Sequence, residues 1–320
     1  MKAALEIQNL HKTYDNGIVA LKGINLSIPQ GSFYGLLGPN GAGKTTTIGI
    51  ITGLVNISNG CATIMGFDSV KDFRQARKLI GLSPQELNFD VFFSMEELLE
   101  LQAGYYGLPY KEAKERTSLM LEQFGLSEKR KARSRELSGG MKRRVQIAKA
   151  LVHDPPIVIL DEPTAGVDIE LRHMLWDYLR EINKEGKTIL LTTHYIEEAE
   201  KLCETVSIIN DGNIIVTDSP EKLTQAHGMS GLEITLGSKL DNLLLDKWRF
   251  KTKDGKILVD TPHPEKDIAE VISQISRQGG SIENVCIYRS TLEDVFMKLT
   301  GETLQDDVIL YTEKEALLNV

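Results

Sequence analysis

Residues 38–45 read Gly38-Pro-Asn-Gly-Ala-Gly-Lys-Thr45, and the apolar run Phe33-Tyr-Gly-Leu-Leu37 stands directly before them. The run predicts a buried strand, and residues 45–54 predict the helix that follows the glycine-rich loop. Glycines allow successive backbone N–H groups to turn inward around an anion, and the helix N-terminus adds the positive end of its dipole. The stretch therefore predicts a phosphate-binding loop, in which Lys44 supplies a point charge and Thr45 a hydroxyl ligand for Mg²⁺.

A second apolar run ends in two acids. Ile157-Val-Ile-Leu160 is followed by Asp161 and Glu162. The carboxyl ends of parallel strands share one edge of a sheet, so Asp161 is expected beside the glycine-rich loop, where it holds Mg²⁺ through water. Glu162 is then placed to orient an attacking water molecule. The two motifs together predict a nucleotide hydrolase or kinase and disfavour the alternative of a strand that merely ends at a charged turn.

A third motif, Leu137-Ser-Gly-Gly-Met141, opens a predicted helix upstream of Asp161. With the two motifs above, its order and spacing resemble the ATPase domains of the ABC family over residues 3 to about 225. The resemblance implies that Ser138, Gly139 and Gly140 grip the γ-phosphate of a nucleotide bound by another protomer, since a helix N-terminus presents N–H donors to an anion. The further residues that carry the resemblance are Gln85, Asp168 and His194.

The resemblance also gives single residues a role. Tyr14 is expected to stack on adenine, although such a tyrosine is more often a packed surface residue. Gln85 is expected to contact Mg²⁺ and water, and Asp168 to communicate across a dimer. His194 is expected to contact the γ-phosphate, although a lone histidine is usually structural. The expected ATP-binding set is Tyr14, Gly38, Pro39, Asn40, Gly41, Ala42, Gly43, Lys44, Thr45, Thr46, Ser138, Gly139, Gly140 and Asp168; the catalytic set is Glu162, His194 and Gln85; the Mg²⁺ set is Thr45, Gln85 and Asp161.

The predicted fold class is α/β: a P-loop ABC ATPase core with an antiparallel β subdomain and a helical insert, followed by a small C-terminal α+β domain. The expected domains are residues 1–227, with the insert at about 85–155, then 228–304 and a tail at 305–320. Short strands are predicted at 3–10 and 20–28. The C-terminal domain is expected to contain a hairpin turning at Asp254-Gly255, a helix at 265–278, a strand at 282–288 and a helix at 292–299.

Bulk composition and charge disfavour several classes of protein. The net charge of −8 disfavours an overall basic surface for nucleic acid. The basic runs 129–135 and 142–144 are interpreted as solvated faces or as caps of backbone carbonyls near helix ends. Three cysteines without a CxxC pair favour a reducing compartment and predict no metal site. Neither a signal peptide nor an apolar run of 18 residues is found, so the chain is expected to serve a membrane only from its side.

Several longer stretches resemble the ATP-binding subunits of bacterial ABC-2-type exporters, whose C-terminal extension ends in a segment like Leu292-Glu-Asp-Val-Phe296. The resemblance implies ATP and Mg²⁺ as cofactors. It also implies a head-to-tail dimer with a second copy, an integral-membrane permease as partner, and a peripheral location on the cytoplasmic face of the membrane. The apolar segment Phe89–Met95 is expected to face that permease in part. Met141, where many members have Gln, and Ala165-Gly-Val167, where many have Ser-Gly-Leu, are small departures that remove no phosphate ligand.

The alternative is a soluble ABC ATPase that acts on ribosomes or DNA. Ribosomal members carry two cassettes, and this chain has one phosphate-binding loop and one signature. Members that act in DNA repair separate the two halves of the ATPase by long coiled coils. In this chain the stretch between Lys44 and Asp161 is too short to hold them. A GTPase would need Asn-Lys-x-Asp, but Asn183-Lys184 continues with Glu-Gly.

Overall fold

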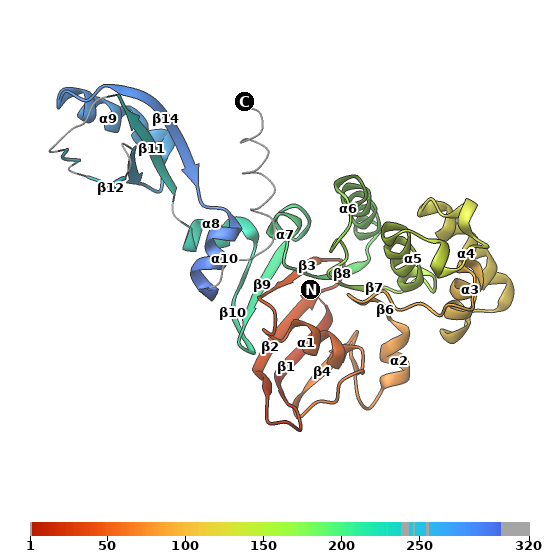
Figure 1. Ribbon diagram of the computed structural model, residues 1–320. Coiled ribbons are helices and arrows are strands. Elements are labelled where there is room, and N and C mark those ends of the chain that lie inside the picture. The colour runs from red at the N-terminus through yellow and green to blue at the C-terminus, as the bar shows by residue number, and fades with distance from the viewer. Residues whose placement is uncertain (1, 229, 238–242, 246, 254–255, 302–320) are drawn as a thin grey trace. The chain divides into compact units, whose positions relative to one another are not determined.

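The computed structural model describes residues 2–228, 230–237, 243–245, 247–253 and 256–301. The predicted tail at 305–320 and the turn at 254–255 lie outside the described residues. The chain divides into two compact units: the first extends to Ser219 and the second begins at Pro220 (Figure 1). Helix α8 (Pro220–His227) thus belongs to the second unit, whereas the sequence placed the division after it. The reason is a tertiary contact, because α8 packs on α10 (Leu292–Thr300) and the Lys298 ammonium donates to the His227 carbonyl over 2.9 Å.

The first unit is built on a six-stranded sheet of order β10-β9-β3-β8-β7-β6, in which only β10 runs antiparallel to its neighbour. Strands β3, β7 and β8 are buried along their whole length, as expected when helices and a second sheet cover both faces of a parallel sheet. The strands are β3 (Phe33–Leu37), β6 (Ile80–Ser83), β7 (Ile157–Asp161), β8 (Thr188–Thr193), β9 (Thr205–Asn210) and β10 (Asn213–Asp218).

A second, antiparallel sheet of order β2-β1-β4-β5 packs against this core. Its strands are β1 (Ala3–Thr13), β2 (Val19–Pro29), β4 (Asn59–Ile64) and β5 (Phe67–Asp68). One hydrophobic cluster contains Leu5 of this sheet, Ile48 of helix α1 (Lys44–Ile51) and Ile159 of β7, so both sheets and α1 share a core. The predicted α/β fold class with an antiparallel subdomain is confirmed.

The helical insert contains α3 (Met95–Tyr105), α4 (Tyr110–Gln123) and α5 (Gly139–Leu151), which contact one another. Ser94 and Glu97 form a capping box at the start of α3. Part of the basic run 129–135 pairs with one acid of this insert, since Arg130 and Lys131 both reach Glu96. The other helices of the first unit are α2 (Phe73–Lys78), α6 (Ile169–Lys184) and α7 (Ile196–Leu202), with short 3-10 turns at Ser127–Lys129 and Ser134–Glu136.

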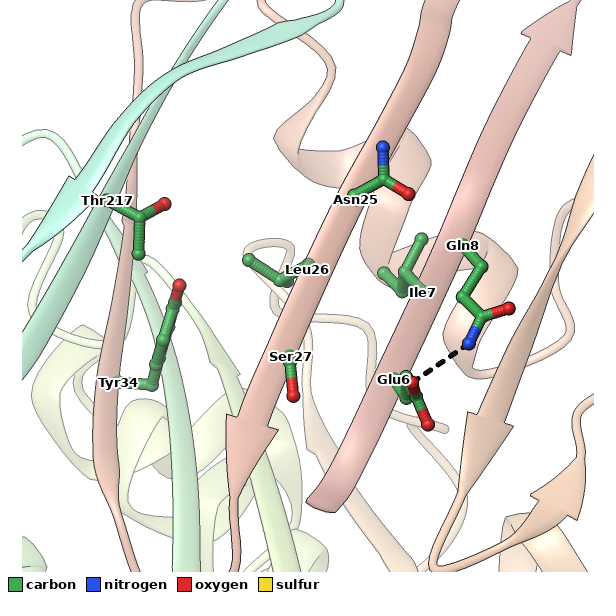
Figure 2. A pocket seen from close by; sticks show the side chains of 8 residues that line it. All are labelled: Glu6, Ile7, Gln8, Asn25, Leu26, Ser27, Tyr34 and Thr217. Atoms are coloured by element: carbon green, nitrogen blue, oxygen red, sulfur yellow. Dashed lines mark hydrogen bonds between the residues drawn. The ribbon is translucent and has the colours of Figure 1, made fainter.

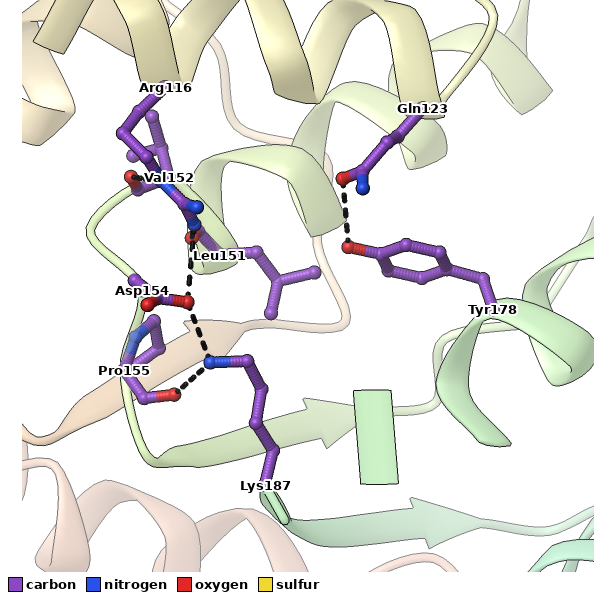
Figure 3. A network of polar contacts seen from close by, with 8 residues as sticks. All are labelled: Arg116, Gln123, Leu151, Val152, Asp154, Pro155, Tyr178 and Lys187. Atoms are coloured by element: carbon purple, nitrogen blue, oxygen red, sulfur yellow. Dashed lines mark hydrogen bonds and ion pairs between the residues drawn. The ribbon is translucent and has the colours of Figure 1, made fainter. Parts of the chain in front are cut away.

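A polar network joins the insert to the core (Figure 3). Arg116 of α4 donates to the carbonyls of Leu151 and Val152 and to Oδ1 of Asp154. Lys187, just before β8, donates to the same carboxylate over 2.7 Å. Burial raises the pKa of Asp154, but the hydrogen bond from Lys187 and the charges of Lys187 and Arg116 outweigh it and hold the pKa below its ordinary value. Asp154 therefore bridges two subdomains through its charge.

The second unit is a four-stranded antiparallel sheet of order β12-β13-β11-β14. Its elements are β11 (Ser230–Leu236), β12 (Arg249–Lys253), β13 (Lys256–Asp260), α9 (Pro264–Arg277) and β14 (Ile282–Arg289), besides α8 and α10. Val271 and Ile275 of α9 pack on Leu232 and Ile234 of β11. The sequence suggested no strand around Gly231, yet β11 passes through it. A Cβ there would meet the Val259 carbonyl at 1.9 Å, so glycine is required by close packing.

We predict that Asp154→Asn destabilises the chain by roughly 0.5–1 kcal/mol at neutral pH, the scale of a partly exposed ion pair. Asp154 has a left-handed backbone with φ 56°, which asparagine tolerates, so the change removes charge and little else. A depressed folded-state pKa stabilises the fold above the unfolded pKa of about 3.9, and this contribution is lost as pH falls through the folded value. In urea unfolding, the difference in unfolding free energy between wild type and Asp154→Asn should therefore be present at pH 7 and shrink at pH 3. The exposed pair Asp177–Arg180 gives a control in Asp177→Asn, and a pH-independent gap for Asp154→Asn would contradict the bridge.

Candidate functional site

The glycine-rich loop lies between β3 and α1 and has the backbone that its glycines permit. Gly43, directly before α1, has φ 113°, and a Cβ on it would meet the Ala20 carbonyl at 2.9 Å. A Cβ on Gly38 would meet the Ile209 carbonyl at 2.3 Å. Packing therefore confines both positions to glycine, and at Gly43 the left-handed backbone does so as well.

Lys44 is the buried cation of this loop. Its side chain is covered, and its ammonium donates to the carbonyls of Gly38 over 2.6 Å and Pro39 over 3.1 Å. Burial lowers the pKa of Lys44, and the negative charges of Glu162 and Asp161 oppose this shift. The ammonium is thus held over the loop within the field of both acids.

The remaining residues of the predicted ATP-binding set in this region differ in exposure. Asn40, Gly41 and Thr45 are exposed, whereas Pro39 and Ala42 are buried. Thr46 shares a hydrogen bond of 3.2 Å with the hydroxyl of Tyr14. The Tyr14 ring is partly exposed, and the Lys12 ammonium lies 4.8 Å from its centroid. Tyr14 is therefore tied to the first turn of α1, at the edge of the loop.

The two acids at the end of β7 occupy different environments. Asp161 is buried and accepts a hydrogen bond of 2.5 Å from Thr192 of β8. Burial raises the pKa of Asp161 in spite of that bond. Glu162 has φ 50°, a left-handed conformation that is uncommon for a residue other than glycine, and its own N–H donates to the Thr192 carbonyl. The turn at Glu162 directs its side chain away from the strand path that Asp161 follows.

The Glu162 carboxylate is held from two sides. Gln85 donates through Nε2 to Oε2 over 2.8 Å, and Nδ1 of His194 lies 3.3 Å from Oε1. The hydrogen bond from His194 lowers the pKa of Glu162 against the effect of burial, and the charges of Lys44 and Arg143 act in the same direction. The structure thus brings together five residues that the sequence singled out: Lys44, Gln85, Asp161, Glu162 and His194.

Ser138 and Asp168 lie elsewhere, at the N-termini of α5 and α6. The Ser138 hydroxyl accepts from the Met141 N–H over 3.3 Å, and Oδ1 of Asp168 accepts from the Leu171 N–H over 2.8 Å. Both residues are exposed. Gly140 packs at Leu171, where a Cβ would come within 2.8 Å of the leucine side chain. The signature and Asp168 therefore adjoin each other and face outward instead of joining the Lys44 cluster.

Arg143 is a residue whose contribution the sequence did not reveal. It is only 3% exposed, and it donates to the carbonyls of Pro84, Gln85 and Glu162 at 3.1, 3.2 and 2.7 Å. Its neighbour Gln146, one turn along α5, donates to the carbonyls of Pro84 and Glu86. The run 142–144 was read as a solvated or helix-capping cluster. Arg143 instead donates to carbonyls of other elements. The sequence signal for this was its i, i+3 spacing with Gln146, which places both side chains on the same face of α5.

The donor set proposed for Mg²⁺ matches the chemistry of that ion. Thr45 offers a hydroxyl, Asp161 a carboxylate and Gln85 an amide oxygen, all of them the hard oxygen ligands that Mg²⁺ prefers. Within the described residues, no group of three or more His, Cys, Asp or Glu side chains forms a metal cluster. A sparse protein donor set is typical of Mg²⁺ sites that rely on phosphate and water for further ligands.

A separate pocket of about 400 Å³ opens where β1 and β2 approach Tyr34 and Thr217 (Figure 2). Two of its lining residues are joined directly, because Gln8 donates to Glu6 over 2.9 Å. The Tyr34 hydroxyl bonds to Ser207, which in turn bonds to Thr217. None of its lining residues belongs to the predicted ATP-binding, catalytic or Mg²⁺ sets.

We predict that Arg143→Met lowers the free energy of unfolding by about 3 kcal/mol, because three carbonyls lose a charged donor and two nearby carboxylates lose a buried countercharge. Chemical denaturation of the purified chain measures this. Lys142→Met, a neighbouring change on the same helix at a less buried position, should stay within about 0.5 kcal/mol of wild type. Equal effects of the two substitutions would show that Arg143 is not the anchor described above.

Comparison with known proteins places these features in a family. The profile of the ABC transporter family matches residues 21–165. The chain is 36% identical to the Nod factor export ATP-binding protein I of Cupriavidus metallidurans, over 96% of this chain and 100% of that protein. It is 33% identical to the linearmycin resistance ATP-binding protein LnrL of Bacillus subtilis, over 94% and 100%.

Solved structures agree with this assignment. An ATP-binding subunit of an ABC transporter superposes with a TM-score of 0.66 at 30% identity, covering 70% of this chain and 93% of that chain. A dimeric ATP-binding cassette in a post-hydrolysis state, bound to ADP and Pi, superposes with a TM-score of 0.63 at 29% identity, covering 67% and 98%. The chain belongs to the ABC transporter family, as an ATP-binding ATPase subunit of the ABC-2 exporter type.

Proposed function

We propose that this chain hydrolyses ATP at the interface of a head-to-tail dimer and thereby drives an export permease carried on another chain. The observation that carries the catalytic part is the Glu162 carboxylate, held ionised between Gln85 and His194 beside Lys44 and Asp161. Lys44 binds the phosphates, and Thr45, Asp161 and Gln85 hold Mg²⁺, which when bound supplies positive charge against the phosphate oxygens. The Glu162 carboxylate accepts a hydrogen bond from the attacking water and aligns it.

The electrostatics support a division between the two acids. Glu162 has a lowered pKa and is a ready hydrogen-bond acceptor at neutral pH, but a weak base in the Brønsted sense. Orientation of water is therefore its main contribution, and His194 fixes the carboxylate for that purpose. Asp161, buried with a raised pKa, gains most from a nearby cation, which fits its proposed place beside Mg²⁺.

The proposed dimer follows from the exposed helix N-termini. Ser138 to Gly140 and Asp168 face outward, so one chain holds two partial sites and no whole one. Two copies in head-to-tail arrangement would bring the signature of each to the nucleotide bound at Lys44 of the other, a position where N–H donors favour an anion. The dimeric cassette bound to ADP and Pi, to which this chain is similar, supports the arrangement.

We predict opposite outcomes for two substitutions in the site. Glu162→Gln keeps the shape and the contact with Gln85 but loses the anionic acceptor, so ATP should bind while turnover falls by about 10²-fold or more. Lys44→Ala removes a ground-state phosphate contact and should weaken ATP binding itself. Equilibrium binding and steady-state hydrolysis, measured on both variants, separate the effects. Turnover of Glu162→Gln at the wild-type rate would exclude Glu162 as the residue that aligns water.

For the permease, the proposal rests on a surface shared by core and insert. A pocket of about 220 Å³ is lined by Leu54 and Arg77 of the core and by Tyr106 at the end of α3. Leu54 is 76% exposed, and so is Tyr105 beside Tyr106. Within the predicted segment 89–95, Phe92 and Phe93 are exposed. Met95, the first residue of α3, is fully buried and is therefore not available to a permease. A helix of the permease seated in this pocket would contact both subdomains at once.

We predict that Phe92→Asp lowers the amount of permease recovered with this chain from solubilised membranes by about tenfold or more, because a charge replaces an exposed apolar contact. ATP hydrolysis by the isolated chain should be unchanged, since Phe92 is largely solvent-exposed. Val70→Asp, at another exposed apolar residue of the same unit, is the matched control and should retain the permease. Loss of basal hydrolysis in Phe92→Asp would assign Phe92 to the fold instead.

The proposed location is the cytoplasmic face of the membrane, held there by the permease. None of the helices in the described part of the chain has the length and apolar character to cross a membrane. The relatives named above export a Nod factor or confer linearmycin resistance, and they match this chain at similar identity. Likeness to them therefore selects the exporter class without selecting a cargo. The alternative of a ribosomal or nucleic-acid partner is not favoured, because the similar curated proteins are named for export and resistance.

A further inference from the structure

The sheet of the second unit has two edges with contrasting sequences. At one edge β12 is five residues long and carries Arg249 and Lys251. At the other, β14 is eight residues long, contains no proline, and within the described residues pairs only with β11. Cys286 is exposed and Ile287 is 42% exposed at this edge. Long edges that lack proline and central charges are the ones that accept another strand.

The phase of the backbone hydrogen bonds shows which β14 groups face the open edge. The Ser230 carbonyl accepts from the Thr261 N–H, so the backbone groups of Ser230 face the β13 side. Because these directions alternate along an antiparallel strand, Glu233 faces β14, where its partner is Cys286. Gly237, of the same phase as Glu233, donates to the Ser281 carbonyl; the β11–β14 register shifts between Thr235 and Leu236, so the regular alternation on β14 begins at Asn284. The backbone groups of Val285 and Ile287, between the β11-facing positions, therefore point to the open edge.

We propose that β14 pairs antiparallel with β14 of a second copy of this chain, with Cys286 on the two-fold axis. In this register the open-edge groups of Val285 meet those of Ile287 of the second copy. Both residues are apolar and, two positions apart, lie on the same face of the strand. Cys286 meets its own copy at a non-hydrogen-bonded position, where Cα atoms lie about 4.5 Å apart.

Charge complementarity selects this register and this occupant. By count along the strand, Glu283, which lies at the register shift, comes opposite Arg289 of the other copy, and the two-fold axis repeats that pair. A shift by two residues in either direction would replace this pairing by Glu283 opposite Ile287 or Arg289 opposite Val285. Arg289 also pairs with Glu265 of its own α9, which leaves it between two acids in the paired state. At the other edge, self-pairing of β12 would oppose basic residues, so it is disfavoured.

This association is distinct from the ATP-dependent dimer under the proposed function, since it needs neither nucleotide nor signature. Both arrangements are two-fold. The second unit would then keep two copies together through a continuous eight-stranded sheet while the ATPase units separate. The inference concerns how the copies are retained and goes beyond the hydrolysis reaction.

The first experiment oxidises the full chain with diamide in the absence of nucleotide and separates it on a non-reducing gel. A Cα separation near 4.5 Å lies within the range for a disulfide, so we expect most of the chain as a covalent dimer. Cys286→Ser, which retains Cys61 and Cys203, should stay monomeric. A Thr252→Cys change in the Cys286→Ser background places an exposed thiol on the other edge and controls for random collision. It should remain uncrosslinked.

Two further variants test the strand pairing without a thiol. Ile287→Pro removes an N–H that faces the open edge and leaves the ladder to β11 intact, whereas Ile287→Thr keeps that N–H. The proline variant should lose nucleotide-free dimer in analytical ultracentrifugation, and the threonine variant should retain most of it. Glu283→Lys opposes like charges twice per dimer and should weaken dimerisation about tenfold. Thermal unfolding of each variant shows whether the unit stays folded.

Ser138→Arg separates this inference from the proposed function, because it blocks the ATP-dependent dimer and should leave the Cys286 cross-link intact. A wild-type chain that forms no cross-link, and whose nucleotide-free association is unaffected by Glu283→Lys, overturns the pairing of β14. Equal cross-linking of the Thr252→Cys variant, whose thiol lies on the other edge, also overturns it. Failure of Glu162→Gln to slow hydrolysis, by contrast, would leave this inference untouched.

Discussion

The site depends on one buried cation, the guanidinium of Arg143, which holds three backbone carbonyls from two separate loops. Two of them belong to Pro84 and Gln85 after β6, and the third to Glu162 after β7. Burial lowers the pKa of Arg143, and the charges of Glu162 and Asp161 oppose that shift. The guanidinium therefore stays charged at neutral pH. Because α5 starts at the signature, this contact ties the signature helix, the Gln85 loop and Glu162 into one assembly.

Adjacent acids with opposite pKa shifts follow from the geometry around that cation. Asp161 continues the buried line of β7 and receives one short bond from Thr192, so burial dominates. Glu162 leaves the strand through a left-handed turn and meets His194 and Gln85. The cost of that backbone, of order 1 kcal/mol or more, is offset by the contacts it makes possible. A residue with a regular extended backbone at this position would follow the strand and could not reach both partners.

The sequence was sufficient for the elements whose pattern is local. The strands at 33–37 and 157–160 and the loop between strand and helix follow from apolar runs and glycine spacing, and the structure has strands there, the second one residue longer than predicted. Arg143 was misread because its partners come from other elements, which no spacing within residues 142–144 reveals. Strand β11 was missed for a similar reason, since Gly231 resembles a loop residue until the Val259 carbonyl is placed beside it. Roles that need a second copy, those of Ser138 and Asp168, remain proposals because one chain leaves both exposed.

The second unit differs from the first in what its polar residues do. Asp267 accepts from Thr261 and from the Trp248 indole, and those bonds lower its pKa; Asp260 accepts from the Tyr288 hydroxyl. Asp267 of α9 accepts from residues that flank β12 and β13, and Asp260 joins β13 to β14. Burial, together with the bond to Asp260, raises the pKa of Tyr288 to about 12, so its proton stays in that bond at physiological pH. Among the described residues of this unit, the open edge of β14 offers backbone groups, which recognise another strand by hydrogen bonds and register.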